Sequence, residues 1–229
     1  EQNIEKLIRK INLFLKNPLI VIVDDSSHKK ILNIIKKKKL KINYYNRGKK
    51  IGRGSAVIFG LKKVINNKKI KAFIEMDADL SHHPNELNRN LKIFFKNNAD
   101  LLIGSRYLKK SKIVNWPISR RIFSFLANLL ARLFIGVPIT DYTNGYRIYS
   151  KRSCKVIIRK CGKIGDGFII LSEIIQEINW KNFKILEIDS IFINRIRGAS
   201  SVNTKLILQS LFGLLILVKK RIKYGFHIH

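Results

Sequence analysis

Cysteine and long apolar runs are the scarcest features of this sequence. The 229 residues include two cysteines, Cys154 and Cys161, and neither lies in a metal-ligand spacing. They cannot form a disulfide framework, a zinc module is not expected, and both are interpreted as ordinary packing residues. No run reaches the roughly 20 apolar residues that a membrane-spanning helix needs, so we expect the chain not to span a membrane.

Acidic side chains are also scarce. Asp and Glu number 15 against 46 Lys and Arg, which gives a formal net charge of +31. Such an excess fits three kinds of partner: nucleic acid, an anionic membrane surface or phosphorylated ligands. Heavy use of lysine, isoleucine and asparagine is equally explained by genome-wide base composition. Because acids are so few, clusters of aspartate are the better guide to function.

The apolar content is ample for a folded core. Hydrophobic residues make up 46% of the chain and aromatic residues 10%, too many for a disordered protein. A chain of 229 residues fits one α/β domain with a small appendage. We assign residues 1–200 to the domain and residues 201–229 to a C-terminal amphipathic helix.

Helix and strand patterns alternate along the chain. Apolar residues recur at helical spacing over 4–15, Pro18 follows, and the apolar run at 19–23 is typical of a buried strand. This alternation predicts a mostly parallel central sheet with helices on both faces. The other predicted helices cover 30–38, 84–97, 118–134, 165–179 and 202–223, with one more after Gly54, and the other predicted strands cover 40–44, 72–76, 100–104 and 184–193.

Aspartates follow two of the predicted strands. Asp24 and Asp25 come after the strand at 19–23, and Asp77 and Asp79 come after the strand at 72–76. The carboxyl ends of parallel strands meet at one rim, where such sheets bind ligands, so these side chains should converge. The D-A-D step places two carboxylates on one side of an extended backbone, as a divalent cation bound to phosphate oxygens requires. An isolated pair of this kind is more typical of a turn.

A glycine-containing step, GRGSA at 52–56, opens a predicted helix. Gly52 and Gly54 would leave backbone amides accessible to nucleotide phosphates, or would permit tight packing of strand against helix. Arg47 and Lys50 lie just before this step and are candidates to hold a nucleotide. In a chain this basic, each of them taken singly is more typical of a solvated loop.

Seven motifs in order carry a family resemblance. VDDSS at 23–27, the segment at 47–56, EMDADLSH at 75–82 and GSRY at 104–107 resemble the family 2 inverting glycosyltransferases. NWPISRR at 115–121, TNGYR at 143–147 and RIRGAS at 195–200 narrow the resemblance to the dolichyl/polyprenyl-phosphate mannosyltransferase group. The motifs together extend over nearly the whole chain.

The resemblance implies a glycosyltransferase-A fold, a nucleotide-sugar donor with GDP-mannose favoured, and Mg²⁺ or Mn²⁺ as cofactor. It matches Asp77 and Asp79 to the metal motif, and Asp79 is also taken as catalytic. The donor-binding positions that we assign are Asp24, Asp25, Arg47, Lys50, Gly52, Gly54, Asp77, Arg195 and Ser200.

The implied acceptor is a polyprenyl or dolichyl phosphate. The resemblance matches Arg106, Arg120 and Ser124 to positions that receive its phosphate, and Arg195 to the arginine that grips the donor diphosphate. A phosphate is already anionic, so it needs orientation and neutralisation more than a general base, and arginine supplies paired donors for it. Arg106 and Arg195 are therefore taken as catalytic, and we expect in-line displacement with inversion at the anomeric carbon.

The helix predicted at 118–134 allows two interpretations. It carries an apolar stripe with Arg120, Arg121 and Arg132 interspersed. Such a stripe usually packs into a core, but it also suits an interfacial helix with arginines at headgroup level. Because Trp116 precedes it and the family motif falls here, we favour the second interpretation, and we place the protein peripherally on the cytoplasmic face of a membrane.

The sequence departs from the family pattern at several points. The family begins with a strand that has no counterpart before Glu1, so we expect the sequence to be incomplete at its amino end, or another segment to fill the gap. Ser201 replaces a customary lysine, Ser26 a glycine, and Arg53 a leucine. Leu171 likewise replaces a glutamine.

Three rival interpretations remain. A transferase of the same fold would use UDP-glucose or another nucleotide sugar. A basic nucleic-acid-binding protein would lose affinity steeply with salt and would be indifferent to Asp77→Asn. An inactive scaffold would explain Ser201 and the absent strand. The leading hypothesis expects no nucleic acid as partner.

Overall fold

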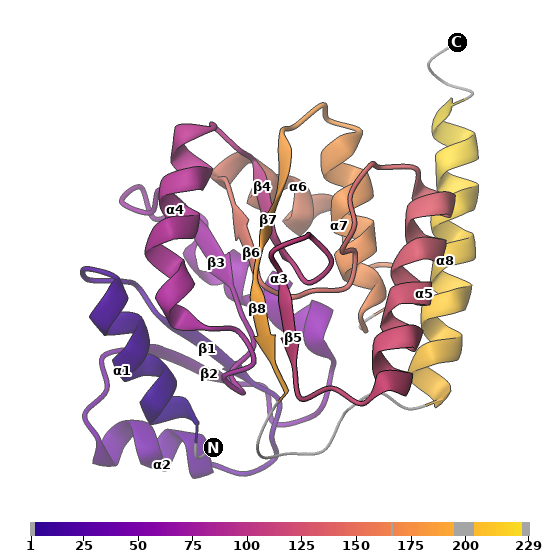
Figure 1. The fold of residues 1–229 in the computed structure, drawn as a ribbon. Coiled ribbons are helices and arrows are strands. Elements are labelled where there is room, and N and C mark those ends of the chain that lie inside the picture. Colours follow the sequence, from indigo (N-terminus) through magenta and orange to yellow (C-terminus); the bar gives the residue numbers. More distant parts are fainter. Residues whose placement is uncertain (1–2, 166, 195–203, 226–229) are drawn as a thin grey trace.

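A computed structural model describes residues 3–165, 167–194 and 204–225. Strands lie at the centre and helices pack on both sides of them (Figure 1). The strands are β1 Val21–Asp24, β2 Asn43–Asn46, β3 Phe73–Glu75, β4 Leu101–Ser105, β5 Lys112–Val114, β6 Arg147–Tyr149, β7 Ile185–Asp189 and β8 Ile191–Ile193. The helices are α1 Ile4–Phe14, α2 Lys30–Lys37, α3 Arg53–Val64, the 3-10 helix η1 Pro84–Glu86, α4 Leu87–Lys96, α5 Ile118–Ile135, α6 Lys151–Lys160, α7 Ile169–Asn179 and α8 Thr204–Gly225.

The largest sheet has the strand order β3-β6-β4-β7. Its centre is β4, whose five residues are all buried. Strand β4 runs parallel to β7 but antiparallel to β6, and β6 is also antiparallel to β3. The sheet therefore contains one antiparallel strand, β6, which the sequence did not predict because three residues are too short to show a periodic pattern. The late strand predicted at 184–193 is divided into β7 and β8, and β7 lies at one end of this strand order.

Two strand pairs stand beside this sheet. Strands β1 and β2 form a parallel pair, and β5 and β8 form another. Strand β1 is bonded to β2 along one edge, and no strand among the described residues is bonded to its other edge.

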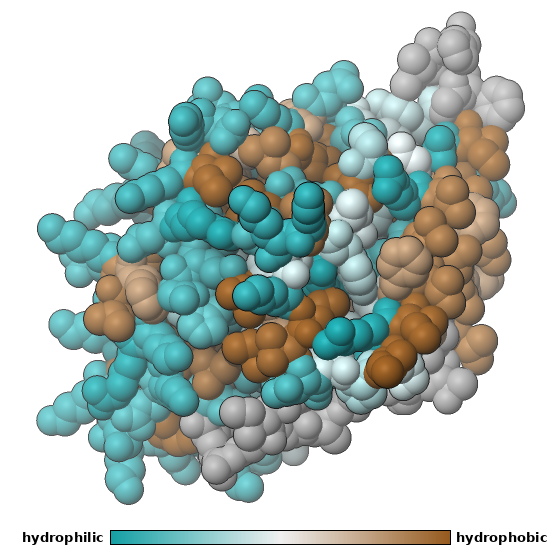
Figure 2. Space-filling view, in the orientation of Figure 1, coloured by the Kyte–Doolittle hydropathy of each residue, from teal (hydrophilic) through white to brown (hydrophobic). Residues whose placement is uncertain are grey.

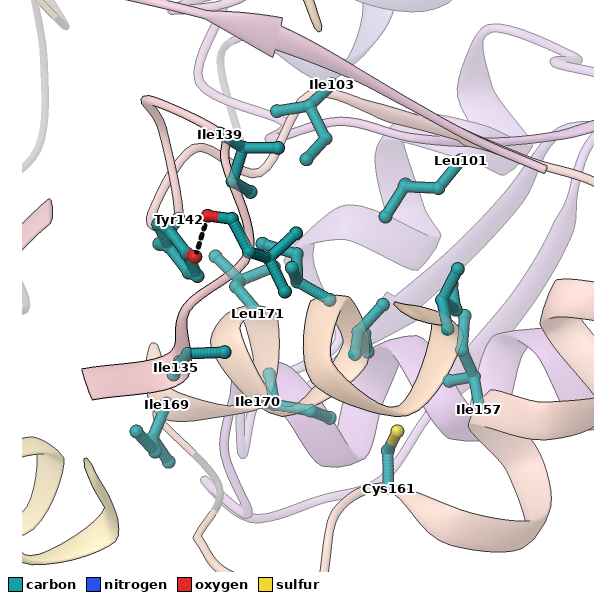
Figure 3. Close-up of a cluster of buried hydrophobic side chains, with 14 of the residues drawn as sticks. Leu101, Ile103, Ile135, Ile139, Tyr142, Ile157, Cys161, Ile169, Ile170 and Leu171 are labelled. Carbon is teal, nitrogen blue, oxygen red and sulfur yellow. Dashed lines mark hydrogen bonds between the residues drawn. The ribbon is translucent and has the colours of Figure 1, made fainter. Parts of the chain in front are cut away.

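The main core lies on the side of the sheet that α6 and α7 cover. Helix α7 is buried along ten of its residues, and its isoleucines meet Leu101 and Ile103 of β4 (Figure 3). Tyr142 is fully buried there and donates a hydrogen bond to the carbonyl of Val137 over 2.7 Å. Cys154 and Cys161 are free and buried in the same region, which confirms them as packing residues.

Helices α5 and α8 pack side by side at one edge of the molecule (Figure 1). The Arg221 guanidinium on α8 donates to the carbonyl of Phe134 on α5 over 2.9 Å, and Gln176 of α7 donates to the carbonyl of Leu217 on α8 over 3.0 Å. Helix α8 is thus attached to the domain through two neighbours. None of the helices in the described ranges combines the length and apolarity needed to cross a bilayer.

Helix α5 places its leucines outward. Asn128 is 3% exposed and donates to the hydroxyl of Thr143, whereas Leu133 is 65% exposed. Figure 2 shows the resulting apolar surface along α5 and α8. We call this surface the apolar face; its members include the exposed residues Ile118, Ile122, Phe125, Leu126, Leu129, Leu133, Leu208, Phe212 and Leu215. The apolar stripe of α5 is therefore not a core stripe.

Candidate functional site

The ends of β1 and β3 form an acidic rim, which we define as Asp24, Asp25, Asp77 and Asp79. Asp24 is buried and faces its own loop and β2: it accepts hydrogen bonds from the Tyr44 hydroxyl at 2.7 Å and from the backbone amide of Ser26 at 2.9 Å. Burial opposes its ionisation, but these bonds hold the pKa of Asp24 below its ordinary value. Asp24 therefore shapes the loop, and Ser26, in place of glycine, takes part in that structure.

Asp25 ties this loop to the start of α3. Its carboxylate receives two bonds from the Arg47 guanidinium, at 2.6 and 2.7 Å, and one from the backbone amide of Gly52 at 3.1 Å. Burial disfavours the charge, yet Arg47 and the backbone donors lower the pKa of Asp25. Gly52 has a φ of 121°, a conformation that side chains rarely adopt. Arg47 thus positions the rim through Asp25.

Arg53 brings the start of α3 to the end of β3. Its guanidinium lies 2.6 Å from the carboxylate of Glu75 and 3.2 Å from that of Asp77. Although burial opposes its charge, Glu75 and then Asp77 raise the pKa of Arg53. Asp25 and Asp77 consequently contact neighbouring residues of the same helix start, so the ends of β1 and β3 meet there. A leucine at position 53 would supply no positive charge to balance these two carboxylates.

His82 links the acidic rim to the rest of the site. Its ring is fully buried; Nδ1 accepts from the backbone amide of Asp77 at 3.1 Å, so the proton lies on Nε2 and is donated to the Asn144 side chain at 2.9 Å. Asp79 in turn accepts from the backbone amide of Ser81 at 3.0 Å. His82 therefore orients the D-A-D turn.

Arg106 lies at the end of β4 and is fixed by a partner that the sequence did not reveal. Its Nε and Nη2 donate to the two oxygens of Asp141, both at 2.8 Å, and Nη2 also donates to the Thr143 hydroxyl at 2.6 Å. Burial disfavours its charge, but Asp141 and, further away, Asp77 hold the pKa of Arg106 above its ordinary value. The two sides of the site therefore interact electrostatically.

Aromatic rings surround Arg106. Its guanidinium carbon lies 5.3 Å from the ring centre of Trp116, and that of Arg120 lies 4.1 Å from the same ring. Tyr107 donates its hydroxyl hydrogen to Ser124 at 2.7 Å. We call Arg106, Tyr107, Trp116, Arg120 and Ser124 the arginine pocket. It brings together the three positions predicted to receive a phosphate. They lie at the amino end of α5, where the apolar face begins.

The remaining predicted residues are placed differently. Gly54 is buried, and a side chain there would meet Ile170 of α7 at 2.8 Å, so helix packing explains this glycine. Lys50 is exposed in the loop before α3. Arg195, Ser200 and Ser201 lie outside the described residues, and their roles stay predictions.

Sequence reasoning missed the supports behind the site. Asp141 holds Arg106, and Glu187 of β7 accepts from the backbone amides of Thr140 and Asp141 at 2.7 and 2.8 Å. Asn144 belongs to the TNGYR motif, and its backbone amide donates to Asp141 at 3.0 Å. The signal was the placement of Asp141 two residues before that motif, since a buried arginine requires a carboxylate close by.

A divalent cation suits the acidic rim only together with a phosphorylated ligand. Within residues 3–165, 167–194 and 204–225, no three His, Cys, Asp or Glu side chains group as a metal site. Asp77 and Asp79 supply two carboxylates, and Mg²⁺ is commonly held by one or two carboxylates with substrate phosphates completing its shell. The residues present therefore fit a cation that arrives with a diphosphate.

The fold has a counterpart among solved structures. The solved structure of glucosyl-3-phosphoglycerate synthase from Mycobacterium tuberculosis, in complex with Mn²⁺, UDP and glucosyl-3-phosphoglycerate, superimposes with a TM-score of 0.66 at 14% identity. The match covers 96% of this chain and 76% of that one. At this identity the likeness establishes the architecture, which confirms the expected glycosyltransferase-A fold.

The chain belongs to glycosyl transferase family 2, whose model matches residues 1–158. A dolichol-phosphate mannosyltransferase of Pyrococcus furiosus is 32% identical over 95% of this chain and 60% of its own length. An undecaprenyl-phosphate mannosyltransferase of Micrococcus luteus is 32% identical over 71% of this chain and 65% of its own length. A polyprenol monophosphomannose synthase of Mycolicibacterium smegmatis is 32% identical over 75% of this chain and 64% of its own length. The chain thus spans less than two thirds of the length of these relatives.

Proposed function

We propose that this protein transfers a hexosyl group, most favourably mannose from GDP-mannose, onto a polyprenyl or dolichyl phosphate at a membrane surface. The names of three relatives support the reaction and the acceptor class. The observation that carries the proposal is the arginine pocket, in which Arg106 is held by Asp141 beside the amino end of α5. A binding place for an anionic head thus adjoins a surface suited to an apolar tail.

The acidic rim would bind the donor. Asp77 and Asp79 would hold Mg²⁺ or Mn²⁺, with Asp25, Arg47 and Gly52 shaping the nucleotide side. When bound, the cation would stabilise the negative charge on the departing nucleoside diphosphate. Arg195, outside the described residues, is proposed to grip the same diphosphate.

The acceptor phosphate needs orientation, not deprotonation. Arg106 and Arg120 would neutralise its charge and aim one oxygen at the anomeric carbon, while Ser124 would add a hydrogen bond. The new bond forms from phosphate oxygen to sugar carbon as the bond from that carbon to the diphosphate breaks. One displacement from the opposite side inverts the configuration, so a product that retains it would refute this mechanism.

The apolar face would lie at the membrane surface. Ile118, Leu133 and Phe212 are 76%, 65% and 66% exposed, an arrangement that water disfavours unless another phase covers it. The basic excess of the chain would add attraction to anionic lipids. Peripheral association with the cytoplasmic face follows as part of the proposal.

Transfer is tested with the chain, Mg²⁺ or Mn²⁺, polyprenyl phosphate in anionic vesicles, and GDP-mannose, UDP-glucose and other labelled nucleotide sugars in parallel. The proposal expects a lipid-extractable labelled product with GDP-mannose. A product only with UDP-glucose would establish the rival transferase. Absence of any product, together with tight and salt-sensitive binding of DNA or RNA, would favour the nucleic-acid hypothesis instead.

A further inference from the structure

The TNGYR motif connects the acidic rim with the arginine pocket through three consecutive residues. On the pocket side, the Thr143 hydroxyl accepts a hydrogen bond from Nη2 of Arg106 at 2.6 Å. On the rim side, the carbonyl of Gly145 accepts one at 3.5 Å from Nη2 of Arg53, which is itself paired with the rim. Asn144 lies between them in the chain and is 1% exposed. A short buried segment thus joins the two parts of the site.

Each polar group of Asn144 has a hydrogen-bond partner. Its side-chain oxygen accepts from Nε2 of His82 at 2.9 Å, and its side-chain nitrogen donates to the carbonyl of Gly104 in β4. Its backbone amide donates to the carboxylate of Asp141 at 3.0 Å, and its carbonyl accepts from Nε of Arg147 at 3.0 Å. A buried polar side chain whose groups are all bonded is held in one orientation. Asn144 is therefore a fixed point between several elements.

His82 connects Asn144 to the D-A-D turn. Its Nδ1 accepts from the backbone amide of Asp77 at 3.1 Å, and its ring is fully buried. The ring stacks on that of Tyr146 with centres 5.5 Å apart, and it meets the ring of Phe192 edge-on at 5.3 Å. Rotation of the imidazole would break both hydrogen bonds and both ring contacts. The D-A-D turn is therefore held to Asn144 through a rigid link.

Asp141 connects Asn144 to Arg106. The oxygen of Asp141 that accepts from the backbone amide of Asn144 also accepts from Nη2 of Arg106 at 2.8 Å. On β4, the side chain of Asn144 holds a carbonyl two residues before Arg106. The D-A-D turn and the Arg106 guanidinium are therefore joined by one continuous series of hydrogen bonds, with Asn144 at its middle.

We propose that Asn144 is a positioning residue of the transfer reaction, which acts through His82 and Asp141 to fix the separation between the D-A-D turn and Arg106. This role rests on the proposed function, because that function places the donor at the rim and the acceptor phosphate in the pocket. In-line displacement requires the attacking oxygen about 3–3.5 Å from the anomeric carbon, and a misplacement of about 1 Å slows a reaction about 100-fold. A fixed separation of the two anchoring groups supplies this alignment.

Two nucleophiles compete for the anomeric carbon of a bound donor. In transfer, the phosphate oxygen bonds to that carbon as its bond to the nucleoside diphosphate breaks. In hydrolysis, a water oxygen takes the same place, and the water loses one proton to solvent. Water is not oriented by Arg106, so misalignment of the pocket against the rim should slow transfer and leave hydrolysis unchanged. The ratio of transfer to hydrolysis therefore measures alignment, and it does not depend on the fraction of the protein that is folded.

His82→Asn tests the link selectively. The new side-chain oxygen takes the place of Nδ1 and can accept from the amide of Asp77, but the shorter side chain does not reach Asn144. The assay uses vesicles with polyprenyl phosphate, Mg²⁺ and labelled GDP-mannose, or labelled UDP-glucose where the unchanged protein transfers glucose. Lipid product should fall roughly 10- to 100-fold relative to free sugar, with the KM values for donor and acceptor unchanged. His83→Asn is the matched control at the next residue, whose ring contacts Asn85 instead, and should leave the ratio unchanged.

Asn144→Ala removes the same link from its other end, together with the bond to Gly104. Its ratio should also fall, and the double variant with His82→Asn should fall no further than Asn144→Ala alone, because both changes remove one shared link. Product formation with an unchanged ratio in both single variants, or losses that multiply in the double variant, would overturn this role and leave the proposed function standing. Absence of lipid product from the unchanged protein would overturn the proposed function and this role with it.

Discussion

The acidic rim and the arginine pocket lie close together but are built differently. Asp77 at the rim has a side chain 37% exposed and its own chain's Arg53 as a neighbour, and the rim grows from the short, partly buried strands β1 and β3. Arg106 in the pocket is 6% exposed, its partner Asp141 is fully buried, and Arg106 directly follows the buried strand β4.

The arginine pocket is therefore preorganised, whereas the acidic rim is completed only when its ligands bind. The pocket holds its charges in position before any ligand binds, because Asp141 is itself fixed by Arg106 and the backbone amides around it. The rim has carboxylates whose negative charge would be balanced by a cation that binds together with a diphosphate. A change at Asp79 should therefore alter ligand binding without altering stability, and changes in the pocket should alter both.

Asp79→Asn should have the largest effect. Loss of one metal ligand should reduce product formation roughly 100- to 1000-fold, comparable with removal of a group that stabilises transition-state charge, while thermal unfolding stays unchanged. Labelled lipid product measured with GDP-mannose and Mg²⁺ checks the first expectation, and a melting curve checks the second. Asp189→Asn, at another strand end, is the matched control and should retain activity. Unchanged turnover in Asp79→Asn would remove the metal role.

Arg106→Lys should affect both stability and acceptor use. Lysine keeps the charge but loses the paired geometry toward Asp141, which should cost about 3 kcal/mol of unfolding free energy. The KM for polyprenyl phosphate should rise roughly 10- to 100-fold while that for the donor is unchanged. Denaturant unfolding and initial rates measure the two quantities. A change confined to the donor KM would contradict the assignment of this pocket.

The apolar face should control membrane binding and should not affect donor binding at the rim. Replacing Leu126, Leu129 and Leu133 together with glutamine should weaken binding to anionic vesicles roughly 100-fold, because burying a leucine stabilises by about 1.5–3 kcal/mol when complete. Vesicle flotation measures this. Leu13→Gln on α1, at a leucine 77% exposed, should have no effect. Undiminished flotation of the triple variant would show that another surface binds the membrane.

Arg53 should give the smallest effect. Arg53→Leu combined with Glu75→Gln removes a cation beside Asp77 without leaving a buried charge alone, so the Mg²⁺ concentration for half-maximal rate should fall roughly fivefold, as loss of an ion pair of about 1 kcal/mol implies. A titration of Mg²⁺ against initial rate measures it. An increase, or no change, would indicate that Arg53 does not compete for Asp77.

The sequence predicted most elements of the fold, and its limits have physical causes. Residues 118–134 were predicted as a helix, but periodicity locates an apolar stripe without revealing what covers it; buried Asn128 decides the orientation. Strand β6 was missed because three residues show no period. At the site, strand-end aspartates were visible as a pattern, whereas Asp141 and Glu187 support Arg106 from distant parts of the chain.

Binding measured separately for donor and acceptor distinguishes the two parts of the site. Asp79→Asn should lose binding of GDP-mannose in the presence of Mg²⁺ but keep binding to vesicles that carry polyprenyl phosphate. Arg106→Lys should keep binding of GDP-mannose but lose the additional binding that polyprenyl phosphate gives over vesicles without that lipid. Equal loss of both ligands in both variants, or retention of both, would contradict a site divided into an acidic rim for the donor and an arginine pocket for the acceptor.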